Sequence, residues 1–227
     1  MRQVCPLRFY ASHSSYISKA PRFNRLHEMS CASDRPAREI SIIVLGDAGV
    51  GKSSLVFSYA LDVSPWSVPD ILEHDLLAEL EVDHELISLK ITRWKDSLED
   101  GQHIPYADVY VVCFSVSKLE SLRSAQKKWI PTIRSYYRNT PIYLVGMKAD
   151  LRDIYTSQKF LHQSMNEGEP VKKRQARKVA SRFKNVWYRE CCTTRGRDVI
   201  NVFERSTKAA LLAEKPEEKV CTVCAVM

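Results

Sequence analysis

Residues 46–53 read GDAGVGKS and follow a short apolar run at residues 40–45. This stretch matches the pattern G-x-x-x-x-G-K-[S/T], with a buried strand expected before it and a helix after it. Glycines in such a loop let backbone N–H groups close around phosphate oxygens, a lysine neutralises phosphate charge, and a serine hydroxyl ligates Mg²⁺. We therefore predict a phosphate site with a Mg²⁺ ligand at Ser53, formed by Gly46, Asp47, Ala48, Gly49, Val50, Gly51, Lys52, Ser53 and Ser54.

Strand and helix patterns alternate on both sides of this loop. Short apolar runs predict strands at residues 40–45, 76–82, 86–91, 107–115, 142–146 and 186–191. Helical patterns are expected from residue 51, at residues 118–137 with an interruption at Pro131, at residues 170–183, and at residues 197–213, where apolar side chains recur at core spacing. This alternation predicts an α/β fold, with a mostly parallel six-stranded sheet covered by helices on both faces.

The composition is that of a soluble domain with a modest basic excess. The chain has 227 residues, of which 44% are hydrophobic and 27% charged, and its formal net charge is +7. A run of about 18 apolar residues is absent, so we expect no transmembrane helix. We expect a flexible extension at residues 1–38, one domain at residues 39–212 and a tail at residues 213–227. The extension is rich in Ser and Arg, and a mitochondrial transit peptide is an alternative interpretation of it.

The cysteines are consistent with reduced thiols and with lipidation. There are seven, an odd number, and they lack the paired spacing of a zinc site. The chain ends Cys224-Ala225-Val226-Met227, a C-a-a-X signal for prenylation in which a terminal Met favours farnesyl. One lipid chain anchors a protein only weakly, so we expect a second signal, with Cys221 as a candidate for palmitoylation.

A base-reading element follows the strand expected at residues 142–146. The carboxylate of Asp150 can accept two hydrogen bonds from guanine, a pair that adenine cannot supply, and the stem of Lys148 can cover the face of the base. Guanine is therefore the expected base, and GTP or GDP with Mg²⁺ the expected ligand.

At this point the sequence resembles the Rho branch of the small GTPases, which implies a small G domain. The resemblance covers residue 39 onward and is carried by GDAGVGKSS (46–54), YADVYVVCFSVSKLESL (106–122), KKWIPTIRSYYRNTPIYLVGMKADLRD (127–153) and VFERSTKAAL (202–211). Residues 154–171 lie where Rho proteins carry an extra helical insert. By the resemblance, Cys192 and Thr193 belong to a segment whose backbone N–H contacts guanine, and Met147 replaces an Asn that braces the phosphate loop. We therefore expect weaker nucleotide binding than in relatives.

The hydrolytic machinery departs from the family pattern in two switch segments. Asp70 stands where the family has a switch I threonine that closes on Mg²⁺, and its carboxylate would repel the γ-phosphate. The family's Asp-x-x-Gly is missing from residues 91–102: strand alternation puts Arg93 at the aspartate, whereas anchoring on Trp94 puts Lys95 there. A loop insertion would place Asp96 and Gly101-Gln102 in these roles, but with the wrong spacing.

The phosphate loop carries one further change near the catalytic centre. Ala48 also replaces a glycine that is usual in the family. For catalysis we name Lys52, with Glu99 and Gln102 as water-positioning candidates. We expect slow or absent GTP hydrolysis.

Three functions remain open from the sequence. The first is a membrane-anchored Rho-like GTP-binding protein, on the cytoplasmic face of the plasma membrane or endomembranes with a cytosolic pool. Its expected partners are effectors and regulators of Rho type and, by the resemblance, it signals to actin, with no nucleic acid involved. The second is a pseudo-GTPase interaction scaffold, and the third is a P-loop kinase or ATPase.

Overall fold

The computed structural model describes residues 38–60, 75–95, 103–157 and 169–213. The expected extension (1–38) and tail (213–227) lie outside this part of the chain, apart from Arg38 and Ala213. Within the described ranges, none of the helices combines the length and apolar character needed to cross a membrane.

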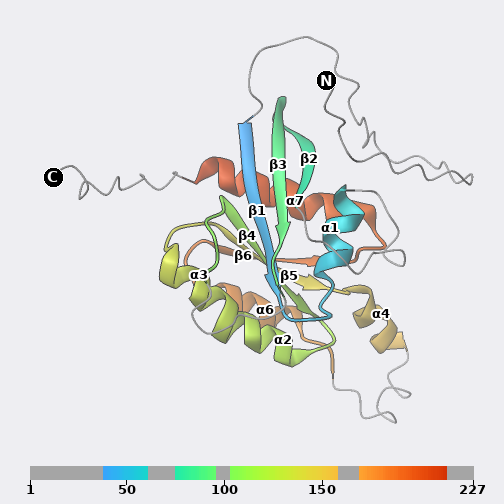
Figure 1. Cartoon of the computed structure of the whole chain (residues 1–227). Helices are drawn as coiled ribbons and strands as arrows, with labels where there is room; N and C mark the ends of the chain where they lie inside the picture. The colour runs from blue at the N-terminus through green and yellow to red at the C-terminus, as the bar shows by residue number, and fades with distance from the viewer. Residues whose placement is uncertain (1–37, 61–74, 96–102, 158–168, 214–227) are drawn as a thin grey trace, which may run out of the picture. The chain divides into compact units, whose positions relative to one another are not determined.

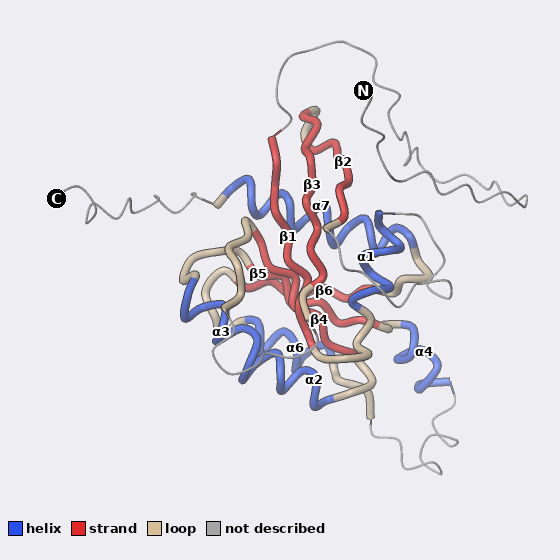
Figure 2. Tube along the Cα trace, in the orientation of Figure 1, coloured by secondary structure: helices blue, strands red, loops and turns tan. Residues whose placement is uncertain are grey.

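In this part of the chain, six strands form one sheet in the order β2-β3-β1-β4-β5-β6 (Figures 1 and 2). All neighbours are parallel except β2 and β3, which are antiparallel. The strands confirm the predicted positions to within two residues at each end: β1 (Arg38–Gly46), β2 (Leu76–Val82), β3 (Glu85–Arg93), β4 (Val109–Ser115), β5 (Ile142–Met147) and β6 (Val186–Cys191). The turn between β2 and β3 has positive φ at both Asp83 and His84, the backbone that a two-residue hairpin requires.

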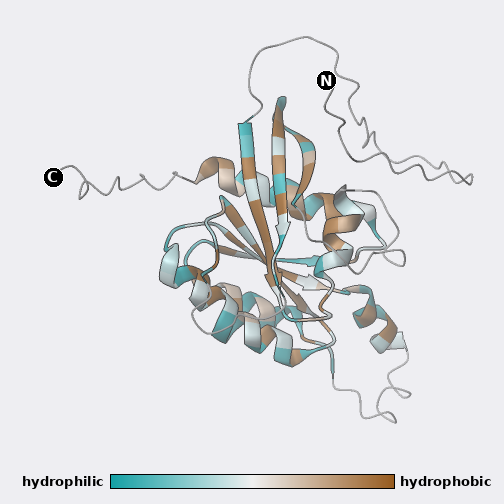
Figure 3. Cartoon of the chain, in the orientation of Figure 1, coloured by the Kyte–Doolittle hydropathy of each residue, from teal (hydrophilic) through white to brown (hydrophobic). Residues whose placement is uncertain are grey.

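Two separate cores follow from the alternation of side chains along the central strands. Ile42 and Val44 of β1 point to one face, where α1 and α7 cover them, whereas Ile43 and Leu45 point to the other, beneath α2, α3 and α6. Because both faces are covered, β4 is buried along its whole length, as the continuous apolar run at residues 107–115 predicted. The apolar colour of the central strands in Figure 3 follows this burial.

In the described ranges the helices are α1 (Lys52–Ala60), α2 (Leu119–Ser124), α3 (Ile130–Tyr136), α4 (Asp150–Ser157), α6 (Lys173–Ala180) and α7 (Gly196–Leu212), and a π-helical turn, η2 (Ala125–Trp129), lies between α2 and α3. The predicted interruption at Pro131 is wrong, because the chain stays helical through that residue. The irregularity comes earlier, at η2, where the Ile130 amide donates to the Ala125 carbonyl, five residues back. Pro131 sits in the first turn of α3, where its missing N–H costs least.

The helix predicted at residues 170–183 is shorter than expected. Val171 stays outside it because its amide donates to the Val116 carbonyl (2.7 Å), and the Lys172 amide is capped by the Gln175 side chain (2.8 Å). The expected insert at residues 154–171 lies mostly outside the described residues. Only Ile154–Ser157, as the end of α4, and residues 169–171 are seen.

Candidate functional site

The phosphate loop leaves β1 at Gly46 and enters α1 at Lys52. Gly46 has φ +140°, and a Cβ placed there would lie 2.3 Å from the carbonyl oxygen of Cys113 on β4. Only glycine fits this position, because the two strands approach each other there at their carboxyl ends. In the sheet, β1 lies between β3 on one flank and β4 on the other, so the strand order reverses direction at β1. Ligands of such sheets usually bind in the crevice at the carboxyl end of the strands where this reversal occurs.

Lys52 is the charged centre of this loop. Its side chain is 3% exposed, and Nζ donates to the carbonyl oxygens of Gly46 (2.6 Å) and Asp47 (2.7 Å). A buried ammonium beside the first amides of α1 makes this end of the sheet strongly attractive to anions. Ser53, the predicted Mg²⁺ ligand, is half-buried in the first turn of α1, directly after Lys52.

The predicted base-reading residues lie against the same loop. Lys148 follows β5 with φ +59°, and its Nζ donates to the carbonyl oxygen of Gly49 (3.0 Å), 99 residues earlier in the chain. Asp150 is the first residue of α4 and is half-buried. The structure therefore brings the phosphate motif and the Lys148–Asp150 motif together, as the sequence analysis required.

The segment after β6 completes this edge of the sheet. The Ala149 amide donates to the Cys191 carbonyl oxygen (3.3 Å), which ties the segment to the loop carrying Asp150. The Cys192 amide donates to the carboxylate of Asp198 (3.3 Å), so it is already engaged. Within the described part of the chain the Thr193 amide donates to no protein acceptor. Of the two residues predicted here, Thr193 is thus the better donor to a base.

Comparison with known protein families matches residues 41–212 to the Ras family. The chain belongs to the Ras family. It is a small GTP-binding protein, and members of this family bind GTP and GDP, typically with Mg²⁺, and act through regulators and effectors. The buried Lys52, the glycine-lined loop and the α1 amides suit the phosphates of such a nucleotide, and the Ser53 hydroxyl suits Mg²⁺, which keeps several waters and binds through few protein ligands.

Met147 lies next to the phosphate loop of this Ras-family chain, with carbon atoms of its side chain facing Gly51. It is 1% exposed, and a Cβ on Gly51 would lie 3.5 Å from its Cε atom. A thioether is only a weak acceptor, so Met147 packs against the loop without the hydrogen bonds that an amide side chain could make. The predicted loss of a polar brace on this side therefore agrees with the contacts.

The end of β3 carries Arg93, one of the two residues that the sequence offered at the position of the family's aspartate. Arg93 is the last residue of β3 and pairs with Val44, and the Trp94 amide donates to the Val44 carbonyl (2.9 Å). Anchoring on strand alternation puts Arg93 at the family's aspartate. A guanidinium has only donors and cannot ligate a metal. The other predicted catalytic and metal residues, Asp70, Glu99 and Gln102, lie outside the described residues, as do the lipidation candidates Cys221 and Cys224.

Two contacts at the site were not predicted from the sequence. The indole Nε1 of Trp129 donates to Oδ1 of Asp47 (2.8 Å), and Asp198 engages the Cys192 amide as described above. Neither contact has a local signal, because the partners come from different elements. Cys113 lies next to Gly46 beneath the loop, where burial raises the pKa of its thiol to about 12 against a smaller opposing effect of Lys52. The thiol is therefore neutral near pH 7 and has no nucleophilic role.

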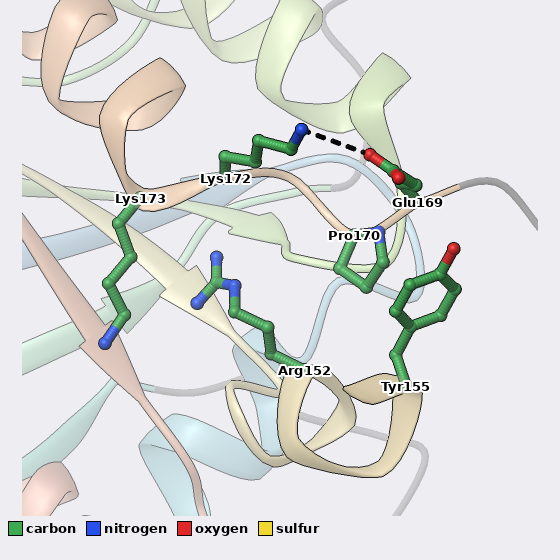
Figure 4. A pocket seen from close by; sticks show the side chains of 6 residues that line it. All are labelled: Arg152, Tyr155, Glu169, Pro170, Lys172 and Lys173. Carbon is green, nitrogen blue, oxygen red and sulfur yellow. Dashed lines mark ion pairs between the residues drawn. The ribbon is translucent and has the colours of Figure 1, made fainter. Parts of the chain in front are cut away.

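A hollow in the described residues lies between α4 and the start of α6 (Figure 4). It has a volume of about 330 Å³ and is lined by Arg152, Tyr155, Glu169, Pro170, Lys172 and Lys173. Its charges are paired: Lys172 with Glu169 (3.3 Å), and both Arg152 (2.5 Å) and Lys173 (3.3 Å) with Glu190 of β6. These pairs join α4, α6 and β6, so we interpret the hollow as a structural junction.

Proposed function

We propose that this small GTP-binding protein is a Rho-type signalling protein that hydrolyses GTP slowly or not at all and is held at membranes by a C-terminal lipid. The observation that supports the catalytic part is Arg93, which ends β3 opposite Val44 of β1 and which, when the alignment is anchored on strand alternation, takes the position of the family's Mg²⁺-holding aspartate. A cation there cannot hold Mg²⁺, directly or through water, in the way that a carboxylate does.

Nucleotide binding in this proposal uses residues that the structure brings together. Lys52 neutralises the β and γ phosphates, the amides of the loop and of α1 donate to phosphate oxygens, and Ser53 ligates Mg²⁺. Asp150 accepts from guanine, the stem of Lys148 covers the base, and the Thr193 amide donates to the guanine oxygen. Bound Mg²⁺ would neutralise phosphate charge during hydrolysis.

The defect lies in the steps after binding. Hydrolysis in this family needs an oriented water and a switch that closes on the γ-phosphate. Asp70 replaces the threonine of switch I, and only Glu99 and Gln102 remain as candidates to orient water. In a chain of this kind, bound GTP would stay unhydrolysed. Its signalling would then depend on abundance, nucleotide exchange or lipidation.

The Rho assignment and the membrane anchor rest on the sequence. Residues 154–171 have the length and position of the Rho insert, and Cys224 opens a C-a-a-X signal, with Cys221 as a second candidate for acylation. By the resemblance, the expected location is the cytoplasmic face of the plasma membrane or endomembranes, with a cytosolic pool, and the expected output is control of actin through Rho-type effectors. A Cys224→Ser variant should move the protein from the membrane fraction to the soluble fraction of the same cells; equal distribution of both chains would contradict the anchor.

The experiment that tests the nucleotide part is the nucleotide content of the full chain, released by denaturation and separated by chromatography, with Lys52→Ala as the control. Mostly GTP in the wild-type chain supports intact binding with lost hydrolysis. Mostly GDP contradicts the hydrolytic defect. No nucleotide, with none taken up on incubation, favours the pseudo-GTPase scaffold, which the apolar Met147 contact would help to explain. Displacement of a bound GTP analogue by ATP would favour the P-loop kinase or ATPase instead.

A further inference from the structure

Trp129 connects the helical layer to the phosphate loop. It is completely buried, although it lies on the helical run between β4 and β5, and its only polar atom reaches Asp47, 82 residues earlier in the chain. The Nε1 to Oδ1 distance of 2.8 Å is that of a good hydrogen bond, and its acceptor is a carboxylate. A buried indole N–H requires an acceptor, and here that acceptor lies in the phosphate loop and not within the core around the ring.

The local backbone supports a directed role for this ring. Trp129 is the last residue of the π-helical turn η2, an expansion that changes the direction of the side chains after it and that occurs often at functional sites. The ring is held in one core cluster among apolar neighbours from β4, α2 and α3, and the Lys128 ammonium lies 5.0 Å from its centroid. A ring fixed on these sides directs its N–H along one line, toward Asp47.

Asp47 is consequently held at two points. Its carbonyl oxygen accepts from Lys52 Nζ (2.7 Å), and its carboxylate accepts from Trp129 (2.8 Å). On the opposite side of the loop, Met147 gives only apolar contact, and the Lys148 ammonium reaches Gly49. Side-chain hydrogen bonds therefore reach this loop from two elements: Trp129 of the helical layer beyond β4 donates to the Asp47 carboxylate, and Lys148 after β5 donates to the Gly49 carbonyl.

We infer that Trp129 is a positioning residue for nucleotide binding: its hydrogen bond to Asp47 holds the phosphate loop in its binding conformation and slows nucleotide release. The inference rests on the proposed function, because it deepens the account of the same site. A loop that is already ordered loses less conformational freedom when it closes on phosphates, so removing the brace weakens binding.

The test compares variants of the full chain loaded with GDP that carries a fluorescent methylanthraniloyl group. Trp129→Phe keeps a buried ring and removes the N–H, whereas Asp47→Ala removes the acceptor. Each should speed nucleotide release about tenfold, and the double variant should release no faster than either, because both remove one shared bond. Asp47→Asn keeps an oxygen acceptor and should restore release to within about threefold of wild type.

Two controls separate positioning from loss of stability. Ile133→Val removes one methylene from the same core cluster on α3, and Trp187→Phe makes the same ring change on β6, where the indole is 43% exposed. Both should leave release unchanged, even where Ile133→Val lowers the melting temperature. Release by Trp129→Phe within twofold of wild type, or effects of the two single variants that multiply in the double variant, would overturn the inference.

A second measurement distinguishes this inference from the proposed function. Hydrogen exchange of the amides at residues 46–51, followed by mass spectrometry on the purified full chain, reports loop order without added nucleotide. Trp129→Phe should exchange these amides at least about fivefold faster than wild type, and unchanged exchange would refute the brace. If the wild-type chain takes up no GDP, the proposed function fails and the nucleotide role of Trp129 with it, whereas the exchange result still decides whether the brace exists.

Discussion

Replacing Gly46 by alanine should damage this protein more than the same change at Gly49, three residues along the same loop. Both glycines have positive φ, +140° at Gly46 and +70° at Gly49. They differ in their surroundings: a Cβ on Gly46 meets the Cys113 carbonyl oxygen at 2.3 Å, whereas a Cβ on Gly49 meets no atom within 4 Å. The pair therefore separates backbone strain, which both variants suffer, from steric collision, which only one suffers.

The expected magnitudes follow from these two terms. Holding a non-glycine residue in an unfavourable backbone region costs about 1–3 kcal/mol, and forcing an atom into a packed contact costs roughly 1–3 kcal/mol more. Gly46→Ala should therefore lower the free energy of unfolding by about 2–6 kcal/mol. Gly49→Ala, in ordinary left-handed backbone, should lower it by about 1–2 kcal/mol. A domain is stable by about 5–15 kcal/mol in total, so the first loss is large.

Gly46→Ala should also abolish nucleotide uptake. Gly46 and Cys113 are register partners on β1 and β4, so relieving the contact must separate the strands where the loop begins and move one carbonyl that holds Lys52. Urea unfolding followed by circular dichroism measures the stability change, and equilibrium binding of GDP measures uptake. If Gly46→Ala is no less stable than Gly49→Ala and binds GDP equally well, the close approach of β1 and β4 at Gly46 is wrong.

Further predictions concern the base, the hydrolytic defect and the buried thiols. Asp150→Asn replaces an acceptor by a donor on one side, so GDP affinity should fall at least about tenfold while xanthosine diphosphate gains; an unchanged preference in a competition assay would remove Asp150 from base recognition. A family segment D-x-x-G-Q in place of residues 93–102 should raise single-turnover GTP hydrolysis at least about tenfold, and no increase while nucleotide stays bound would show that our account of the defect is wrong. Burial raises the pKa of the Cys113 and Cys191 thiols, to about 12 for Cys113 from an ordinary 9.0. At pH 9 both should resist alkylation until the chain unfolds, as peptide mass spectrometry can measure, and alkylation of the native chain would contradict their burial. The folded state binds the Cys113 proton more tightly than the unfolded state does, so the stability that this thiol contributes is present below pH 9 and declines as the pH rises toward 12. In urea titrations at several pH values, Cys113→Val should reduce this decline.

The sequence by itself determined the elements and the chemistry of single motifs. Strand and helix positions were predictable because burial on both sides of a sheet leaves apolar runs, and burial on one side of a helix leaves a periodic pattern. The residue types at positions 46–53 identified a phosphate loop, because few other sequences let so many backbone amides converge on one phosphate group. Lys148 and Asp150 were recognisable because guanine demands a carboxylate at one place. The π-helical turn at Ala125–Trp129 was not predicted, because nothing in the residues AQKKW distinguishes it from an ordinary helical turn.

Only the tertiary structure decided which residues meet. Lys148 reaches Gly49, and Trp129 reaches Asp47, because β4 and β5 add to the same side of β1 in parallel and bring their following segments to one region. Strand pairing also set Arg93 opposite Val44 at the end of β3. Contacts of this kind depend on register and on crossover connections between distant segments, and a one-residue shift of a strand would exchange its two faces. The physical reason is that local composition encodes burial and propensity, whereas the partner of a buried polar group is fixed only when the chain has closed around it.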